Sequence, residues 1–535
     1  MTQLFVGGRV FTADPSLPWA EALVVDGDRI TAVGDRDTCT AAAGDGAEVV
    51  DASGCVLLPG FVDGHSHLLM TGSALSQAQL RDATTLDEIR RRLVEWAEAN
   101  PDSPYVLGTS FLFDAVPDNE PTRHMLDDLF PDKPVFIDSF DLHCGWVNTA
   151  ALELMEITDD TADPIGGEIR RDADGRATGY LLETALHDHM WRLLARVDEP
   201  TRDRHLAVAM RALNESGTTT AIDMAVDGDD AGAFSRAEQH GTLSLRVIGH
   251  WIIRNTGDDA RNLAQVEEAA RRRDQHTGPM FRVAGIKLVT DGTIDACTAA
   301  MVEPYTTGGN CDPIWPRERL EPVVELADRL GLQVACHAIG DQAVRNAIDA
   351  IERAQRINGT GANRHRIEHL EYADPADIPR LGANGITASM QPVHCDPAIA
   401  GNWAEMIGPE RAQLGFAWPE YLRSGATLAF GTDTPTAPHM PLPNMYIGAT
   451  RRSPTRPDLE PLRPDFALPV DETIVHGTAD AAWASFEEDR LGVLKVGACA
   501  DLVMIDDDPF AHGAEALLRA RVRRTVVAGR TVFEA

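Results

Sequence analysis

Short apolar runs alternate with helical patterns through the middle of the chain. Most of the apolar runs are followed by a segment with helical spacing, such as residues 341–357. Eight such units predict a parallel (β/α)8 TIM barrel, an α/β fold. An open doubly wound sheet would need a glycine-rich phosphate turn after an early strand, and the sequence offers no good match. The eight predicted strands are 55–62, 218–224, 244–253, 281–289, 332–337, 365–370, 386–391 and 427–432.

The two ends of the chain and one long interval depart from this alternation. Residues 1–58 and 486–535 contain short strand patterns separated by Gly and Asp turns, and we expect both ends to pair into one small β-sandwich. The interval 68–217 is too long for a single barrel connection. It predicts an inserted α/β subdomain at about 80–200 within a barrel domain of residues 59–485, placed over the barrel mouth.

Composition narrows the class of partner. The chain has 83 acidic and 48 basic residues and a net charge of −35, which disfavours nucleic acid and anionic membranes. Its eight cysteines form no C-x-x-C pair, so we expect free thiols in a reducing compartment. We see no signal peptide and no apolar stretch long enough to span a bilayer. These features make a cytoplasmic enzyme the default expectation and do not by themselves identify a partner.

Six potential metal ligands follow the predicted strands. Because the C-terminal ends of parallel barrel strands meet at one mouth, these side chains would gather around one or two ions. Neutral imidazole suits zinc and other transition metals better than calcium or magnesium. A single barrel histidine is more often a packed core residue, but four at strand ends favour ligands. Lys287 could extend towards solvent and Asp433 could cap a turn. The six residues are His65, His67, Lys287, His337, His369 and Asp433.

Several motifs carry a resemblance to a known family. The chain resembles the amidohydrolase superfamily and, within it, the YtcJ-like metal-dependent hydrolases. The resemblance extends over nearly the whole chain, both ends included. The segments that carry it are Pro59-Gly-Phe-Val-Asp-Gly-His-Ser-His67, Gly285-Ile-Lys-Leu-Val-Thr-Asp-Gly292, Ala335-Cys-His-Ala-Ile-Gly-Asp-Gln342, Arg366-Ile-Glu-His-Leu370, Phe430-Gly-Thr-Asp-Thr-Pro435, His143-Cys-Gly-Trp-Val-Asn-Thr-Ala-Ala-Leu152 and Gly179-Tyr-Leu-Leu-Glu183.

The resemblance implies a role for each ligand. His65 and His67 correspond to a pair on the more buried zinc ion, and His337 and His369 to ligands of a second ion. Lys287 corresponds to a carboxylated lysine that bridges both ions in many relatives. Asp433 corresponds to the residue that binds metal and moves the catalytic proton. A homodimer is a further expectation from the family.

Other residues are weaker candidates. His143 is expected to contact substrate or stabilise an oxyanion, although a structural role is an alternative. Its surroundings read Asp-Leu-His-Cys where relatives usually have Asp-Gly-His-Ala, and Gly108-Thr-Ser-Phe-Leu-Phe-Asp114 departs from a common Gly-Trp-Asp. These departures indicate a reshaped pocket. The predicted substrate-binding residues are Glu183, Asp291, Gln391 and His394.

Together these features predict a metal-dependent amidohydrolase. The expected reaction is hydrolysis of a non-peptide C–N bond, in an N-acyl or N-formyl amide or a cyclic amide, by metal-activated hydroxide with Asp433 as proton shuttle. A deaminase or ester hydrolase on the same site is an alternative, and so is a non-catalytic binding protein. Lys287 argues against the deaminase, and the complete ligand set argues against the binding protein.

Overall fold

The computed structural model describes residues 1–535 except 141, 165, 195–196, 360 and 362. These residues divide into two compact units. One contains residues 1–68, 210–434 and 438–535, and the other contains residues 69–209 and 435–437. The range expected for the inserted subdomain falls within the second unit. The aspartate of the Asp-Leu-His-Cys motif lies outside the described residues.

Eight parallel strands form the core of the first unit, in the order β19-β18-β17-β16-β15-β14-β13-β6. The two outermost strands, β6 and β19, approach each other. Two hydrogen bonds join the residues at and just past their ends: Asp433 N donates to His65 O at 2.7 Å, and His67 N donates to Thr434 O at 3.0 Å. This nearly closed parallel sheet confirms the predicted barrel. The strands are β6 (Phe61–Ser66), β13 (Thr218–Val226), β14 (Arg246–Ile253), β15 (Phe281–Val289), β16 (Gln333–Ala338), β17 (Arg366–His369), β18 (Thr387–Met390) and β19 (Leu428–Phe430).

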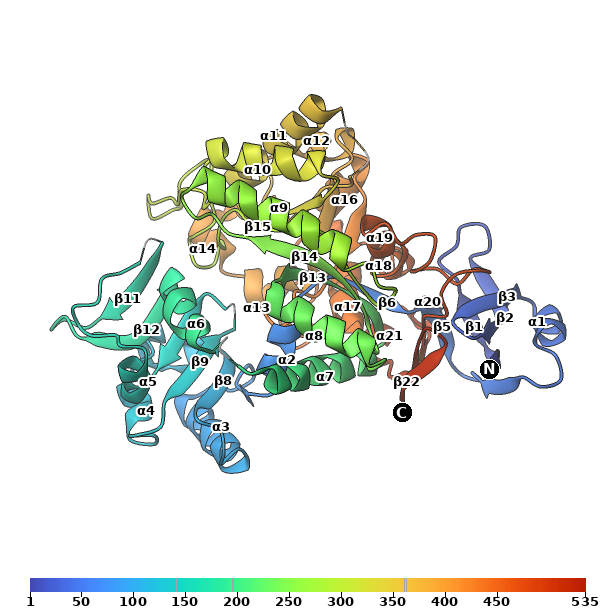
Figure 1. The fold of residues 1–535 in the computed structure, drawn as a ribbon, viewed down its shortest axis with the longest axis horizontal. Coiled ribbons are helices and arrows are strands. Elements are labelled where there is room, and N and C mark those ends of the chain that lie inside the picture. The colour runs from blue at the N-terminus through green and yellow to red at the C-terminus, as the bar shows by residue number, and fades with distance from the viewer. Residues whose placement is uncertain (141, 165, 195–196, 360, 362) are drawn as a thin grey trace. The chain divides into compact units, whose positions relative to one another are not determined.

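Helices between successive strands pack on the outside of this sheet. Neighbouring helices α9, α10 and α11 lie side by side there (Figure 1). α11 begins after Gly340 and is followed by its cap Gly359, which takes a left-handed φ of 68°. Its buried Val344, Ile348 and Ile351 recur at helical spacing, as the sequence pattern required. The longer helices of this unit are α8 (Gly228–Gln239), α9 (Asp259–Gln275), α10 (Arg317–Arg329), α11 (Asp341–Asn358) and α17 (Pro441–Thr450).

The first predicted strand, 55–62, is wrong in its extent. Residues Val56–Pro59 form β5, which pairs with β20 (Leu502–Ile505), and the barrel strand β6 begins only at Phe61. Gly60 separates the two strands, and its N–H donates to Asp501 O at 3.0 Å. A Cβ at Gly60 would lie 2.2 Å from Thr219 Oγ1, so a side chain does not fit there. The barrel strand therefore carries His65 inside it.

Both ends of the chain contribute to one hydrogen-bonded sheet of eight strands. Its order is β22-β21-β20-β5-β1-β2-β3, with β4 paired to β1. Phe5, Leu23, Leu502 and Val526 are buried in its core. The pairing of the two ends is thus observed, whereas their arrangement as a sandwich stays a prediction. The remaining strands are β1 (Thr2–Phe11), β2 (Trp19–Asp26), β3 (Arg29–Gly34), β4 (Glu48–Asp51), β21 (Val522–Val527) and β22 (Arg530–Glu534).

The second unit is built on a mixed sheet of six strands in the order β11-β12-β10-β9-β8-β7. Phe111, Phe136 and Trp146 are buried in its core. A single π-helical turn, Leu186–Trp191, follows β12. Its strands and two of its helices are β7 (Ala78–Gln79), α3 (Leu86–Ala99), β8 (Val106–Phe111), β9 (Val135–Ser139), β10 (Cys144–Val147), α5 (Thr149–Leu154), β11 (Gly167–Arg171) and β12 (Ala177–Glu183).

Two expectations from composition can be compared with this structure. All eight cysteines are free thiols. Among the described residues, no helix has both the length and the apolar character that crossing a bilayer requires. The compartment itself stays a prediction.

Candidate metal centre

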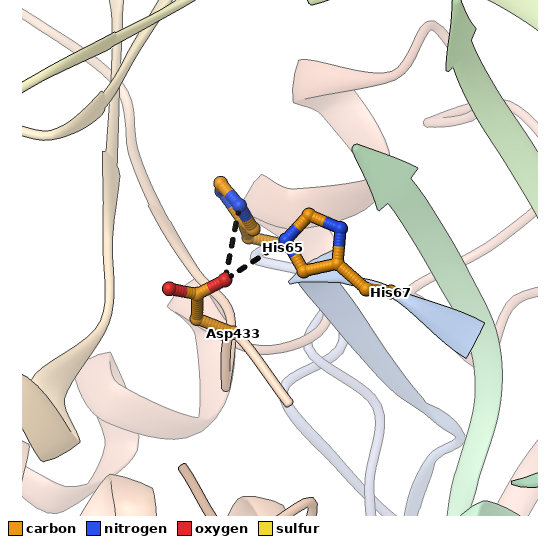
Figure 2. A group of neighbouring side chains, drawn as sticks. All are labelled: His65, His67 and Asp433. Carbon is orange, nitrogen blue, oxygen red and sulfur yellow. Dashed lines mark hydrogen bonds and ion pairs between the residues drawn. The ribbon is translucent and has the colours of Figure 1, made fainter. Parts of the chain in front are cut away.

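His65, His67 and Asp433 converge at the seam between the first and last barrel strands (Figure 2). His65 lies near the end of β6, His67 is the first residue past it, and Asp433 follows β19 by three residues. Asp433 Oδ1 lies 3.2 Å from His65 Nε2 and 3.1 Å from His67 Nε2. Residues more than 350 positions apart in the sequence thus face each other, as the barrel hypothesis required.

Two glycines allow this close approach. A Cβ at Gly64 would lie 2.5 Å from Phe430 O, and one at Gly431 would lie 2.3 Å from His65 N. Asp63 secures the same seam, because its Oδ1 accepts from Thr432 N at 2.8 Å and its Oδ2 from the Thr432 hydroxyl at 2.6 Å. The sequence around the first histidine pair therefore also fixes the position of the loop that carries Asp433.

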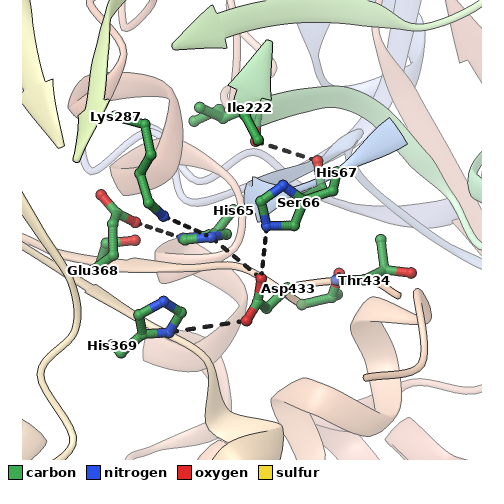
Figure 3. A network of polar contacts seen from close by, with 12 residues as sticks. His65, Ser66, His67, Ile222, Lys287, Glu368, His369, Asp433 and Thr434 are labelled. Atoms are coloured by element: carbon green, nitrogen blue, oxygen red, sulfur yellow. Dashed lines mark hydrogen bonds and ion pairs between the residues drawn. The ribbon is translucent and has the colours of Figure 1, made fainter. Parts of the chain in front are cut away.

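A buried network orients His65 (Figure 3). Glu368 Oε2 lies 2.7 Å from His65 Nδ1, and Glu368 Oε1 accepts from Arg366 Nε at 2.7 Å. Arg366 also donates to Gly64 O at 2.7 Å. Since an ionised carboxylate only accepts, the proton of His65 is assigned to Nδ1, which leaves Nε2 facing Asp433. Carboxylates commonly orient metal-binding histidines in this way.

Lys287 lies inside β15, is buried, and places its Nζ 3.3 Å from His65 Nε2. Burial lowers the pKa of Lys287, and Glu368 and Asp433 oppose this effect. Burial and the neighbouring Lys287 lower the pKa of His65. Burial alone would raise the pKa of Asp433, but the surrounding histidines outweigh it and hold the pKa well below its usual range. These shifts favour a neutral His65 and an ionised Asp433, the forms that bind metal.

The second oxygen of Asp433 faces two further histidines. His369, at the end of β17, places Nδ1 4.0 Å from Asp433 Oδ2, and His394 places Nε2 3.5 Å from it. His394 belongs to the short 3-10 turn η4 (Pro392–Cys395) that follows β18. Burial, reinforced by His337, lowers the pKa of His369. His369, His394 and Asp433 form a second group that could hold an ion.

Strained backbone occurs at both sides of this centre. Asp433 has a φ of 58° and His369 a φ of 74°, both in the left-handed region that residues with a Cβ rarely adopt. Such conformations cost about 1–3 kcal/mol each and persist where surrounding contacts enforce them. Their occurrence at two predicted metal ligands is consistent with a functional site.

The donor set fits a transition metal. Zn–N and Zn–O bonds of about 2.0–2.1 Å in a tetrahedron place neighbouring ligand atoms about 3.3 Å apart. The observed separations of 3.2 and 3.1 Å from Asp433 Oδ1 to His65 Nε2 and His67 Nε2 match this edge. On the other side, His369 Nδ1 is buried and has no hydrogen-bond partner among the described residues. A metal ion would satisfy it.

The remaining predicted residues of this unit differ in their surroundings. Asp291 Oδ2 accepts from Gly340 N at 2.8 Å and its Oδ1 from Ile339 N at 3.1 Å, so it supports the loop backbone. Burial raises its pKa to about 7 against these backbone donors. His337 places Nε2 3.6 Å from Asp291 Oδ1. Gln391 is buried, and neither polar atom of its amide has a hydrogen-bond partner among the described residues.

His143 and Glu183 lie together in the second unit. His143 Nδ1 is 2.9 Å from Glu183 Oε2, and Glu183 N donates to His143 O at 2.8 Å. Glu183 has a φ of 50°. The two predicted residues therefore form a carboxylate–imidazole pair, with Glu183 at the end of β12 and His143 directly before β10.

Comparison with known proteins decides the family. A model described as "Amidohydrolase family" matches residues 48–533. The chain belongs to the amidohydrolase family. It is 29% identical to the putative amidohydrolase YtcJ of Bacillus subtilis over 546 residues, which cover 100% of each chain. This likeness confirms the YtcJ-like resemblance inferred from the motifs.

Two further relatives of this amidohydrolase widen the comparison. An N-substituted formamide deformylase of Arthrobacter pascens is 26% identical over 551 residues, covering 100% of this chain and 99% of the relative. The crystal structure of a metal-dependent hydrolase from Pyrococcus horikoshii superposes with a TM-score of 0.79 at 26% identity, over 96% of this chain and 99% of the other. The amidohydrolase thus shares its fold along nearly its full length with a metal-dependent hydrolase.

Sequence reasoning gave no role to four charged residues of this amidohydrolase's centre: Asp63, Arg366, Glu368 and Glu371. Three of them lie inside the family motifs, next to predicted ligands. Their signal was a charged residue within a buried strand or at its end, where an unpaired charge would be costly. Glu371 lies two residues past His369 and is likewise buried.

Proposed function

We propose that this amidohydrolase is a metal-dependent enzyme that hydrolyses a non-peptide C–N bond of a small molecule. An N-formyl or N-acyl amide, or a cyclic amide, is the proposed substrate class. The observation that carries the proposal is Asp433, whose two carboxylate oxygens each face a pair of imidazole nitrogens. The name of the formamide deformylase relative supports the choice of an amide.

His65, His67 and Asp433 are the proposed ligands of one ion, with zinc as the proposed metal. His337 and His369 are proposed at a second ion, and Lys287 is proposed to bridge the two as a carbamate. The lowered pKa of Lys287 supports this modification, because carboxylation requires a neutral amine. When bound, such ions polarise a carbonyl group and lower the pKa of water.

The chain's own groups would bind, orient and move protons. Asp433 is the proposed proton carrier: the site holds it as a carboxylate, and a carboxylate in this position could take a proton and pass it to the leaving amine. Glu368 keeps Nε2 of His65 directed at the centre. Gln391, with a buried amide that has no partner among the described residues, is proposed to contact substrate.

The other predicted roles also remain part of the proposal. His143 is proposed to contact the substrate or its oxyanion, with Glu183 holding the imidazole at Nδ1. Asp291 and His394 were predicted to bind substrate, and Asp291 is proposed to act through the loop backbone it supports. A cytoplasmic location and a homodimer stay predictions from sequence.

Turnover of a substrate panel tests the function. The zinc-loaded protein would be assayed with N-formyl and N-acyl amines, cyclic amides, esters and aminopurines, beside Asp433→Asn and an exposed control, Asp160→Asn. We expect amide hydrolysis that falls about 10²–10⁴-fold in Asp433→Asn, the usual contribution of a proton-transfer group, and is unchanged in the control.

Two other results of this assay would contradict the proposed amide hydrolysis. Release of ammonia from aminopurines with no amide hydrolysis would replace the proposal by a deaminase. No turnover by metal-loaded protein would favour the binding-protein alternative.

A further inference from the structure

Arg451 is a buried cation outside the candidate metal centre. It directly follows α17, and its side chain is fully buried. Its Nε donates to Leu462 O at 2.8 Å and its Nη1 to Phe416 O at 3.3 Å, whereas its Nη2 has no hydrogen-bond partner among the described residues. A guanidinium stays protonated in proteins and can only donate. One nitrogen of a buried positive charge is therefore left without an acceptor.

Trp418 supplies a second buried donor beside it. This residue begins α16 (Trp418–Arg423) and is fully buried, and its ring faces the guanidinium, with Arg451 Cζ 4.2 Å from the ring centroid. Its Nε1 also has no hydrogen-bond partner among the described residues, and an indole N–H can only donate. Two neighbouring planar groups thus each keep a buried N–H without an acceptor, which costs free energy unless an acceptor is bound.

Among the described residues, Arg451 has no counter-charge of its own. Arg463 and Asp465 act on it electrostatically, but they pair with each other at 2.7 Å. Its two other ionisable neighbours are neutral near pH 7, because burial raises the pKa of the Cys395 thiol to about 12 and raises the pKa of the Tyr421 hydroxyl above its ordinary value. A buried charge that lacks an opposite charge is costly.

The chemistry of these groups selects the occupant. A bound anion would neutralise the guanidinium and accept from both N–H groups at once. The rings of Phe416 and Trp418 lie beside the guanidinium and offer no further donors on their faces. Sulfate or phosphate would bring oxygens that find no donor here and a second charge to bury. A spherical monovalent halide accepts from any direction and carries a single charge, so it suits two donors.

We infer that Arg451 Nη2 and Trp418 Nε1 bind one chloride ion, which neutralises the buried guanidinium. The ion connects α16 to the segment that follows α17, where Arg451 is also bonded to Leu462. The site uses none of the residues of the candidate metal centre, and it does not depend on the proposed hydrolase function.

Thermal unfolding in chloride tests this site. The protein would be exchanged into gluconate, and chloride would then replace gluconate at constant ionic strength, so that general screening of charges stays the same. Arg451→Met removes the charge and its donors, and Trp418→Phe keeps the aromatic face but removes the Nε1 donor. Arg452→Met, at the exposed neighbouring position, is the matched control. Crystals soaked in bromide would locate the ion by anomalous scattering.

Chloride should raise the melting temperature of wild type and of Arg452→Met. Above the Kd, each tenfold rise in chloride should change the unfolding equilibrium constant about tenfold, as the binding of one ion requires. Arg451→Met should lose this dependence. Trp418→Phe should bind chloride about 10–100-fold more weakly, because one hydrogen bond to a charged acceptor is lost. Bromide should lie between the side chains of Arg451 and Trp418.

A wild-type melting temperature that does not respond to chloride at constant ionic strength would overturn the inference. Bromide found only at other positions would do the same. If Arg451→Met does not fold, Trp418→Phe decides: a chloride dependence equal to that of wild type refutes the site. Stabilisation by sulfate but not by chloride would refute the choice of a halide.

Discussion

Asp138 provides a stability test whose sign and size follow from its burial. It lies in β9, is 8% exposed, and its Oδ1 accepts from Trp191 Nε1 at 2.8 Å. Burial raises its pKa from 3.8 to about 7, and the Trp191 hydrogen bond opposes this only in part. In the folded protein the carboxyl therefore keeps its proton to near neutrality, whereas the unfolded chain releases it in mild acid.

The effect on stability follows from proton linkage. Between the two pKa values the folded state binds more protons, so the free energy of unfolding falls as pH rises and levels off above the folded pKa. Each pH unit between the two pKa values lowers the free energy of unfolding by about 1.4 kcal/mol. Over the roughly three pH units from the unfolded to the folded pKa, this amounts to at most about 4 kcal/mol. Asp138→Asn has no charge to bury and keeps an oxygen for Trp191. It should be more stable than wild type by up to about this amount at about pH 8.

Urea unfolding followed by tryptophan fluorescence would measure the difference at several values between about pH 4 and about pH 8. The advantage of Asp138→Asn should grow as pH rises and vanish near the unfolded pKa. Asp160→Asn, in the same unit and exposed, should follow wild type throughout. Equal pH dependence of wild type and Asp138→Asn would refute the reasoning, since the proton would then not be held by this carboxyl.

Three further predictions concern the first unit. Glu368→Gln should weaken binding of the first ion by about 10–100-fold, measured by Zn²⁺ competition, because its carboxylate orients His65; unchanged affinity would contradict this. Gly431→Ala should destabilise the protein by about 1–3 kcal/mol, measured by chemical denaturation, because its Cβ would lie 2.3 Å from His65 N. Gly425→Ala is the comparison: it has open space around it but a φ of 88°, so its cost reports backbone strain without crowding. Asp501→Ala should cost about 3–5 kcal/mol, because it leaves Arg246 buried without the partner now 2.6 Å away; a cost below about 1 kcal/mol would show that this pair is effectively solvated.

Strand periodicity was enough to predict the barrel, because short apolar runs recur eight times and most are followed by a helical pattern. It could not predict where the chain changes from one sheet to another. Residues 55–62 look like one strand, yet they belong to two sheets, since Gly60 packs against Thr219 and joins them. That break depends on a tertiary contact, which no local pattern contains.

The same limit applies to the candidate site. The positions of His65, His67, His369 and Asp433 at strand ends followed from the sequence, but the direction of each ring did not. Nε2 of His394 faces Asp433 because Glu371 lies at hydrogen-bond distance from its Nδ1. Glu371 is an acidic residue that sequence alone could equally assign to a substrate pocket.

The contacts that close the barrel between β6 and β19 also hold the backbone of the candidate metal centre in position. Asp433 has a left-handed backbone, and its N donates at 2.7 Å to His65 O in the strand that it faces. Asp63 holds the preceding residue, Thr432, through both of its oxygens. The contacts that close the barrel therefore also offset the strain of presenting the Asp433 carboxylate to both pairs of histidines. A substitution that loosens the seam should for this reason reduce metal affinity and stability together, whereas one at Glu368 should reduce metal affinity while the seam contacts remain.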